Sequence, residues 1–232
     1  MHSRSQLVLG ENSTDILHTK TVMLLGVGGV GSYALEALAR SGIGRIIIVD
    51  GDEVSESNLN RQLLALRSTV GRSKVVIAAE RIADIDPQIE VQAINRFVLP
   101  ENIEELPIDN CDCVLDAIDT VGTKLALAEW SAASGVPLIS CMGTGNKLDP
   151  SQFVAADIFA THGCPLARIM RSELKKRGVT KLRVIYSPEP PCNAVAADSS
   201  EGRHSPGSVP FVPGAAGLLM AAEAVKLLLN MK

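Results

Sequence analysis

The chain has 232 residues, of which 46% are apolar and 21% are charged, so wholesale disorder is excluded and a single large domain is expected. Its 22 Lys and Arg against 26 Asp and Glu give a net charge of −4. This balance argues against a wholly cationic protein but leaves room for a local basic patch. Aromatic residues make up only 3%, too few for a base-stacking platform of the kind that single-strand-binding proteins use.

The five cysteines include no Cys-x-x-Cys pair, so neither a disulfide scaffold nor a four-cysteine zinc site is expected. Residues 1–10 contain no apolar run of the kind found in a signal peptide. The most apolar stretch, residues 211–229, carries Glu223 and Lys226, and we interpret it as a buried helix and not as a membrane span. These features favour the reducing cytoplasm.

Strand and helix patterns alternate along the chain. Strands are expected at residues 21–25, 46–49, 91–94, 114–115, 137–141, 153–157 and 182–186. Helices are expected at residues 30–40, 74–85, 125–133 and 165–177. This order predicts an α/β fold, a Rossmann-like doubly wound and mainly parallel sheet with helices on both faces. Residues 187–213, with six prolines, are expected to form a long C-terminal crossover loop, and residues 214–229 a last helix.

A glycine-rich segment at residues 26–31, Gly-Val-Gly-Gly-Val-Gly, follows the first strand and opens a helix. Its glycines permit a tight turn, and the helix N-terminus adds amide donors for a phosphate. Asp50 ends the second strand, 19 residues after Gly31, where an acidic residue can hold ribose hydroxyls. A turn that serves only helix packing is the alternative. The pattern predicts a nucleotide site that comprises Gly26, Gly28, Gly29, Gly31 and Asp50.

The residues after Asp50 favour ATP over a redox dinucleotide. A dense polar set follows it in the sequence, comprising Asp52, Asn58, Arg61, Gln62 and Lys74. Hydride transfer does not require so many polar side chains. A triphosphate does, because the planar guanidinium group of Arg61 and further cations can bind its phosphate oxygens. Asp116 and Asp119 end the fourth strand, where carboxylates are suited to Mg²⁺. Each residue alone could be a solvated loop residue, but the whole set predicts ATP and Mg²⁺.

These motifs resemble those of the adenylating superfamily related to ubiquitin-activating enzyme and to the ThiF/MoeB proteins. The resemblance rests on the glycine loop, Asp50-x-Asp52, the run 58–62, the run 71–74 and Asp116-x-x-Asp119. It implies an enzyme that adenylates a carboxylate with ATP and Mg²⁺ and releases pyrophosphate. In this reading Arg61 and Lys74 are catalytic at the phosphates and Asp119 is the Mg²⁺ ligand. The resemblance also implies a homodimer, with Arg4 reaching into the partner subunit's site.

The downstream half resembles one branch, the tRNA threonylcarbamoyladenosine dehydratases. The similar segments are residues 36–44, 83–87, 139–143, 147–150, 157–158, 161–168 and 211–217. This implies one adenylating domain over residues 1–232, with a nucleotide-binding part at about 20–150 and an acceptor-binding part at about 151–232. The reaction implied is ATP-dependent cyclisation of threonylcarbamoyladenosine in tRNA. No covalent enzyme nucleophile is required, and Cys164 is expected to be a buried or incidental thiol.

Other functions remain alternatives. One is activation of a carrier protein's C-terminal glycine, against which the missing Cys-x-x-Cys pairs count. A nucleotide-dependent interaction module without chemistry and a redox dehydrogenase are less favoured, because neither needs the charged set. The sequence does not indicate which tRNAs are used or which sulfur-transfer or iron–sulfur proteins cooperate.

A basic segment provides a candidate surface for tRNA. Residues 161–185 hold seven Lys and Arg against the single acid Glu173, a local charge of +6. Arg168, Arg171 and Lys175 follow the i, i+3, i+7 spacing of one helix stripe. Such a stripe suits a phosphate backbone, and a solvated basic face is the alternative.

Overall fold

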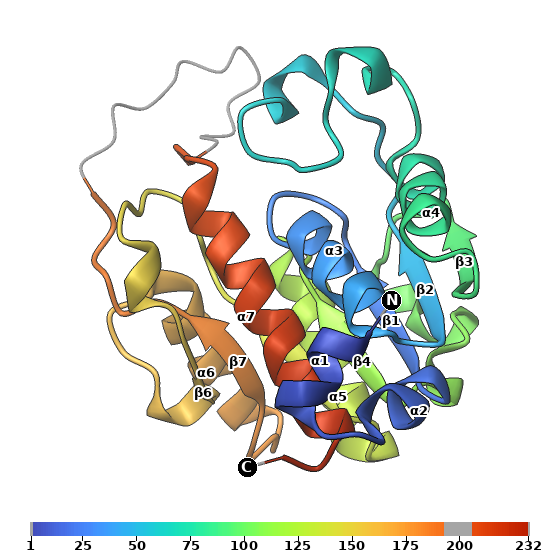
Figure 1. Ribbon diagram of the computed structural model, residues 1–232. Coiled ribbons are helices and arrows are strands. Elements are labelled where there is room, and N and C mark those ends of the chain that lie inside the picture. The colour runs from blue at the N-terminus through green and yellow to red at the C-terminus, as the bar shows by residue number, and fades with distance from the viewer. Residues whose placement is uncertain (1, 193–205, 232) are drawn as a thin grey trace.

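The computed structural model describes residues 2–192 and 206–231; residues 193–205 of the expected crossover loop lie outside the described residues. The described part folds as a seven-stranded sheet between helices (Figure 1). The strands are β1 Thr21–Leu25, β2 Arg45–Val49, β3 Glu90–Ile94, β4 Cys113–Asp116, β5 Leu138–Cys141, β6 Val154–Asp157 and β7 Arg183–Tyr186. The helices are α1 Ser3–Leu9, α2 Ser13–His18, α3 Gly31–Ser41, α4 Lys74–Ile85, α5 Val121–Ser134, α6 Pro165–Lys176 and α7 Phe211–Leu228.

The strand order is β3-β2-β1-β4-β5-β7-β6, and every pairing is parallel except that of β6 with β7. β1 lies between β2 and β4, so the chain reverses its direction of travel across the sheet at this point. In open α/β sheets the crevice beyond the carboxyl ends of two such strands is where ligands bind. Leu25 pairs with both Val49 and Asp116, so the loops after β1, β2 and β4 leave the sheet at one level.

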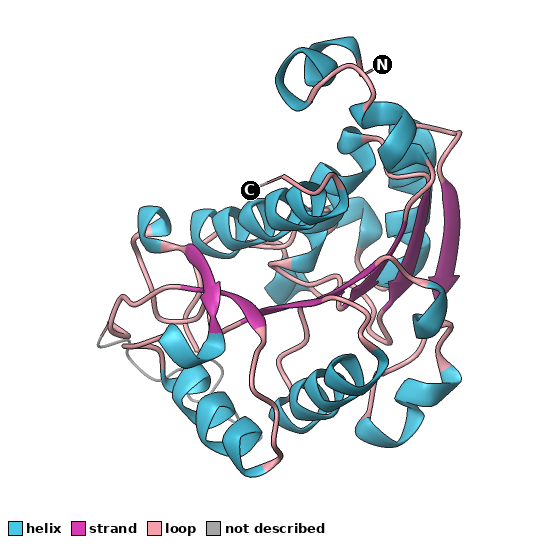
Figure 2. Ribbon diagram, turned by 90° about the horizontal axis from the view of Figure 1, so that it is seen from below, coloured by secondary structure: helices cyan, strands magenta, loops and turns pink. Residues whose placement is uncertain are grey.

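The sheet is buried on both faces, and alternate residues of each strand enter different cores. Val22 and Leu24 of β1 pack into the core that α3, α4 and α7 complete, whereas Met23 and Leu25 pack with α5 and α6. Figure 2 shows the three layers, with α7 above the sheet and α5 and α6 below it. This arrangement explains why β1 and β2 are continuously apolar in the sequence. The expected doubly wound, mainly parallel fold is confirmed.

α7 is the only helix among the described residues with the length and apolar composition of a membrane span. It packs against α3 and against four strands of the sheet, and 56% of its apolar window is buried within the protein. Gly217 allows the close crossing with α3, because a Cβ at this position would lie 2.2 Å from the carbonyl oxygen of Val30. α7 is thus a core helix of this fold.

Candidate active site

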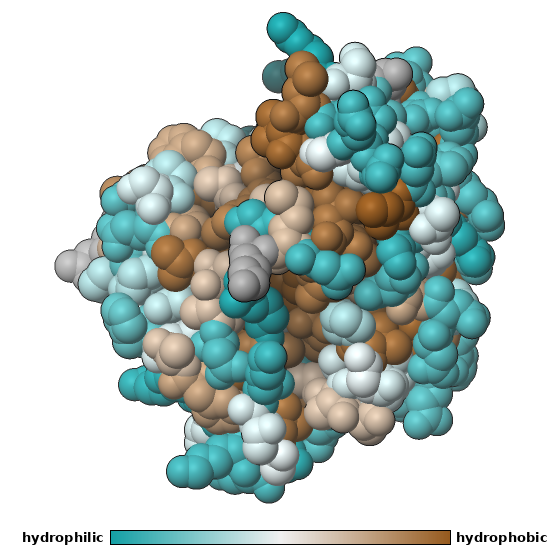
Figure 3. Space-filling model, turned by 60° about the horizontal axis from the view of Figure 1, so that its bottom comes forward, coloured by the Kyte–Doolittle hydropathy of each residue, from teal (hydrophilic) through white to brown (hydrophobic). Residues whose placement is uncertain are grey.

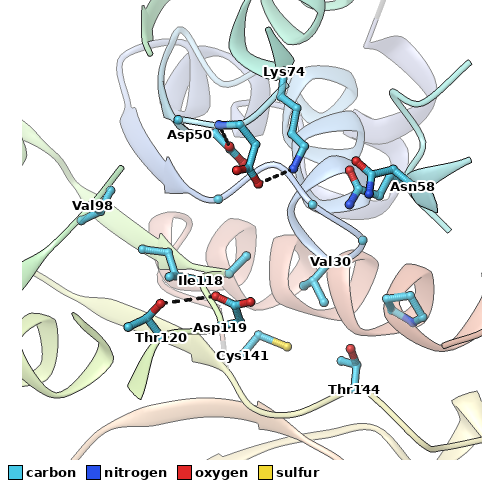
Figure 4. Close-up of a pocket in the computed structure, with 18 of the residues that line it drawn as sticks. Val30, Asp50, Asn58, Lys74, Val98, Ile118, Asp119, Thr120, Cys141 and Thr144 are labelled. Atoms are coloured by element: carbon cyan, nitrogen blue, oxygen red, sulfur yellow. Dashed lines mark hydrogen bonds and ion pairs between the residues drawn. The ribbon is translucent and has the colours of Figure 1, made fainter. Parts of the chain in front are cut away.

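A cavity of about 760 Å³ opens at the carboxyl edge of the sheet. Its walls come from the loops after β1, β2, β3, β4 and β5 and from the start of α7. Ten of the expected nucleotide-site and catalytic residues line it: Gly26, Gly28, Gly29, Asp50, Asp52, Asn58, Arg61, Gln62, Lys74 and Asp119. Figure 4 shows Asp50, Asn58 and Lys74 on one side of the cavity and Asp119, Cys141 and Thr144 on the other.

Two expected site residues lie elsewhere. Gly31 does not line the cavity; a Cβ there would lie 1.9 Å from the carbonyl oxygen of Gly26, so this glycine is needed for the tight turn between β1 and α3. Arg4 lies on α1 and is not among the lining residues of its own chain's cavity.

Asp50 anchors the glycine loop. One carboxylate oxygen accepts a hydrogen bond from the Val27 backbone N–H at 2.6 Å, and the other accepts one from the Asp52 N–H at 2.8 Å. Each oxygen keeps a further lone pair, and Asp50 lines the cavity. The sequence predicted only a ribose ligand here, and the structure adds this positioning role.

Lys74 begins α4 and is held over the cavity by Asp52. Its side chain is only 5% exposed, and its Nζ lies 2.7 Å from Asp52 Oδ2. Lys74 is therefore a buried cation with one carboxylate partner, and its other two protons remain to meet an anion. Asp52 also lines the cavity and its side chain is 53% exposed, so its expected place at the phosphates stays a prediction, to which the structure adds this pairing with Lys74.

Arg61 provides a second cation at the rim. Its Nη1 donates to the carbonyl oxygen of Ser57 and to the side chain of Asn60, and no carboxylate pairs with it among the described residues. Asn58 is buried and accepts the Ser55 N–H, which shapes the short helical turn that holds Arg61 in place. Arg61 and Lys74 thus place two cationic groups suited to phosphates on a part of the lining that also carries carboxylates.

The two carboxylates after β4 have different environments. Asp119 is exposed at the cavity, and its only described hydrogen bond is a long one from the Thr120 hydroxyl, at 3.4 Å. Asp116 is fully buried and pairs with Lys124 at 2.9 Å. The interpretation that both carboxylates face a Mg²⁺ site is therefore wrong for Asp116, because its oxygens are already bonded within the protein.

Further cavity residues were missed by sequence reasoning. They lie after β3 (residues 96–99), at and after the end of β5 (residues 141–145), in the crossover loop (Pro206 and Ser208) and in the first turn of α7 (Pro213), and Leu166 joins them from α6. The rule that ligands bind beyond the carboxyl ends of parallel strands could have identified the first two groups. The group after β5 has no charged residue, and the group after β3 has only Arg96, which pairs with Glu105, so neither drew attention in the sequence.

The buried cysteines are poor nucleophiles. Burial raises the pKa of the Cys141 thiol to about 12, and the Cys164 side chain is only 2% exposed. Cys111 and Cys113 are buried as well, as expected for core residues, and Cys192 is exposed. The expectation that Cys164 is a buried thiol is confirmed.

Comparison with known proteins identifies the family. The ThiF family profile matches residues 2–232. The chain belongs to the ThiF family. It is 44% identical to the tRNA threonylcarbamoyladenosine dehydratase of Bacillus subtilis, over 98% of this chain and 94% of that protein. It is 40% identical to the Escherichia coli enzyme of the same name, over 74% of this chain and 65% of that protein.

A solved structure supports the same branch. The chain superimposes with a TM-score of 0.88 and 32% identity on Escherichia coli tRNA N6-threonylcarbamoyladenosine dehydratase in complex with ATP, over 98% of this chain and 93% of that one. The resemblance stated from the sequence is thus confirmed at the level of family, branch and fold.

Proposed function

We propose that this protein is an ATP-dependent dehydratase that adenylates the threonine carboxylate of threonylcarbamoyladenosine in tRNA and drives its cyclisation. The observation that carries the proposal is the cavity itself. It joins the amide-rich glycine loop, Asp50 and two cations on one side to an exposed carboxylate, Asp119, on the other. The similarity to dehydratases along nearly the whole chain supports the same function.

The lining of the cavity supports one orientation of the nucleotide. Amides of the glycine loop at the start of α3 face the phosphates, and Asp50 accepts ribose hydroxyls while it continues to hold the loop. Arg61 and Lys74 balance the charge that develops on the phosphate oxygens. The apolar residues Phe97, Val98 and Leu99 provide a wall for the base.

Magnesium fits the donor set. Mg²⁺ is usually held by one or two carboxylates together with substrate phosphates and water, and Asp119 offers one carboxylate with free lone pairs. Among residues 2–192 and 206–231 no cluster of three acidic, His or Cys side chains forms an all-protein cage. Bound at Asp119, the ion would supply charge neutralisation at the phosphates.

The chemistry is two displacements. A carboxylate oxygen of the substrate attacks the α-phosphorus, the bond to the bridging oxygen breaks, and pyrophosphate leaves. The carbamoyl group then attacks the activated carbonyl carbon and loses a proton, and AMP departs with the former carboxylate oxygen. The net change in the substrate is loss of water. The protein positions the reactants and stabilises the charge, and no covalent enzyme intermediate is needed.

The acceptor reaches the cavity beside α6. Leu166, in the first turn of α6, lines the cavity, and Arg168 is exposed two residues later on the same helix. Of the three expected tRNA-binding residues, Arg168 and Lys175 form no ion pair among the described residues, whereas Arg171 donates to the Thr161 hydroxyl. Lys176, Arg177 and Arg183 are paired with carboxylates. We therefore place tRNA contact at Arg168 and Lys175, with Arg171 beside them.

The protein is proposed to act in the cytoplasm as a homodimer. Figure 3 shows apolar side chains gathered on one face of the molecule with polar residues around them. Leu7 and Val8 of α1 are 86% and 81% exposed, and Leu218 of α7 is 51% exposed. Exposed apolar groups of this size mark contact surfaces. Since Arg4 lies on the same short helix, docking of α1 on a second copy would carry Arg4 towards the partner.

The test is product analysis. Wild-type protein with ATP, Mg²⁺ and threonylcarbamoyladenosine-containing tRNA is expected to release pyrophosphate and to convert the nucleoside to a product lighter by one water. Asp119→Ala should melt like wild type, because the side chain is exposed, and lose turnover by about two orders of magnitude or more. Arg72→Ala, an exposed cation paired with Glu80 outside the cavity, is the control that keeps activity.

The same assay separates the alternatives. Pyrophosphate release with a carrier protein ending in glycine, and none with tRNA, would replace the dehydratase by a carrier-activating enzyme. Binding of ATP without pyrophosphate release from either acceptor would favour an interaction module.

A further inference from the structure

A fully buried ionic cluster lies beneath the cavity. Lys124 of α5 is 1% exposed and Asp116, the last residue of β4, is 0% exposed. The Lys124 Nζ lies 2.9 Å from Asp116 Oδ2, 3.3 Å from Ser140 Oγ and 2.7 Å from the carbonyl oxygen of Cys141. All three ammonium protons therefore have acceptors. Ser140 Oγ donates its own proton to Asp116 Oδ2 at 2.5 Å.

This cluster connects two walls of the cavity. Asp116 Oδ1 accepts the Ile118 N–H at 3.1 Å, which fixes the turn immediately before Asp119. Lys124 holds the Cys141 carbonyl, from which the other wall, residues 141–145, continues. Ala117 in turn donates to the Leu25 carbonyl of β1 at 2.9 Å, so the turn is also tied to the base of the glycine loop.

Stability alone does not account for such a pair. Two charges removed from water pay a desolvation cost that their attraction barely offsets, and apolar residues of similar volume often stabilise a fold equally well. What the pair adds is a fixed geometry with four directed hydrogen bonds between two strands and a helix. These hydrogen bonds fix the backbone at the start of the loop that carries Asp119.

We propose that Lys124 is a positioning residue, which acts through Asp116 and the Cys141 carbonyl to set the place of the Asp119 carboxylate. The proposal rests on the proposed function, in which Asp119 meets the metal ion and the phosphates. Lys124 itself touches no substrate, since it does not line the cavity. Its loss should therefore act on the use of Mg²⁺ and on turnover more than on the binding of ATP.

The test uses Asp116→Asn/Lys124→Met, because Lys124→Met alone would leave an unpaired buried carboxylate and endanger folding. We expect the melting temperature of this double variant to lie within a few degrees of that of wild type. Amides of residues 117–120 and 142–145 exchange with deuterium about tenfold faster or more. Half-maximal pyrophosphate release requires about fivefold more Mg²⁺ or more, kcat falls about tenfold or more, and the KM for ATP stays within about twofold.

A matched control exists at the other end of the same strand. Lys20 and Asp112 form a 3.0 Å pair, and Asp112 also accepts the Thr21 N–H, at the amino edge of β1 and β4. The variant Asp112→Asn/Lys20→Met should leave the Mg²⁺ requirement and kcat unchanged. Ser140→Ala removes two hydrogen bonds of the buried cluster with little change of volume but leaves the ion pair, and should show smaller shifts in the same direction. It serves as the test if the double variant does not fold.

The outcomes are distinct. A folded double variant, or a folded Ser140→Ala, with wild-type exchange at residues 117–120 and a wild-type Mg²⁺ requirement overturns the proposal. If wild type releases no pyrophosphate at all, the proposed function fails instead. The exchange measurement still decides whether Lys124 orders the Asp119 loop.

Discussion

Asp50 and Asp116 both end parallel strands, and the sequence treats them alike as candidate ligands. The structure separates them by their neighbours. Asp50 is bonded to two backbone amides and still borders the cavity, whereas Asp116 meets Lys124 eight residues away, one α5 turn into the helix. Sequence reasoning found the right edge of the sheet, because strand ends are readable. It did not predict which carboxylate would form a salt bridge with a buried cation, because nothing in the sequence distinguishes Lys124 from an ordinary surface residue of a helix.

The cysteines provide a prediction at the scale of residues. The thiolate is the reactive form, and burial raises the pKa of Cys141 and of Cys113 to about 12 and that of Cys111 to about 11. At about pH 8 an alkylating reagent is therefore expected to modify the exposed Cys192 of the native protein and to leave these thiols intact. Mass analysis of the labelled peptides, with activity measured on the same sample, checks this.

Activity should survive the labelling, and Cys164→Ser should be nearly silent. Labelling of Cys141 or Cys164 as fast as Cys192, with matching loss of activity, would require a covalent mechanism. The raised pKa values of the buried thiols also predict how the free energy of unfolding depends on pH. In the folded protein these thiols stay protonated above the ordinary cysteine pKa of about 8.5. Their contribution to the free energy of unfolding is therefore complete below that pH and is lost as the pH rises towards 12.

At the scale of elements, the strands and long helices were predicted closely. α4 begins and ends where expected, because a run of apolar residues at helical spacing is closed by Asp86 and Pro87. α7 begins at Phe211, three residues before the expectation, because Pro213 is tolerated in the first turn of a helix. α1 and α2 were not predicted: they are short, and α1 has no buried residue, so no periodic apolar pattern marks it.

The crossing of α7 with α3 gives an element-scale prediction. Gly217→Ala would place a methyl group 2.2 Å from the Val30 carbonyl and should lower the free energy of unfolding by about 1–3 kcal/mol or more, as overpacking does. Since Val30 directly precedes α3 at the end of the glycine loop, the KM for ATP should rise as well. Denaturant titration and steady-state kinetics measure the two effects.

Gly214→Ala is the matched control on the same helix. The added Cβ would lie 3.3 Å from the ring of Tyr33, a side chain that can move aside. Its effect on stability should be much smaller, with no change in the KM for ATP. Equal effects of the two substitutions would show that the tight backbone crossing is not what holds the glycine loop in place.

At the scale of the whole molecule, the charge of α6 predicts the salt dependence of tRNA binding. Arg168→Glu/Lys175→Glu should weaken tRNA binding and flatten its dependence on salt, because fewer counterions are released from the RNA. ATP binding should stay unchanged, since neither side chain lines the cavity. Filter binding across a salt series measures it.

Lys20→Glu/Arg40→Glu makes the same change of net charge outside α6, at the residue before β1 and in the last turn of α3, where each cation is already paired. It should bind tRNA like wild type. If both double variants weaken binding equally, net charge and not the α6 surface governs the interaction.

The proposed role of Arg4 requires a second subunit. If Arg4 completes the partner's site, Arg4→Ala and Asp119→Ala homodimers are each inactive, but exchange of their subunits creates one site with both residues intact. Mixing the two inactive proteins should then restore a fraction of the wild-type pyrophosphate release. Light scattering establishes that the species is a dimer. No recovery after proven subunit exchange would place Arg4 outside the chemistry.

The position of α7 affects how the protein is made. The contacts that shape each half of the cavity are short in sequence: Val27 to Asp50 spans 23 residues, and Asp116 to Ser140 spans 24. Both halves can form while the chain is still emerging from the ribosome, at about 5–20 residues per second. The face of the sheet shared by α3 and the later strands, however, stays uncovered until residues 211–228 arrive. During synthesis the nascent protein therefore exposes a broad apolar surface next to a nearly finished nucleotide site, and it is at that stage that a chaperone would have the most to bind.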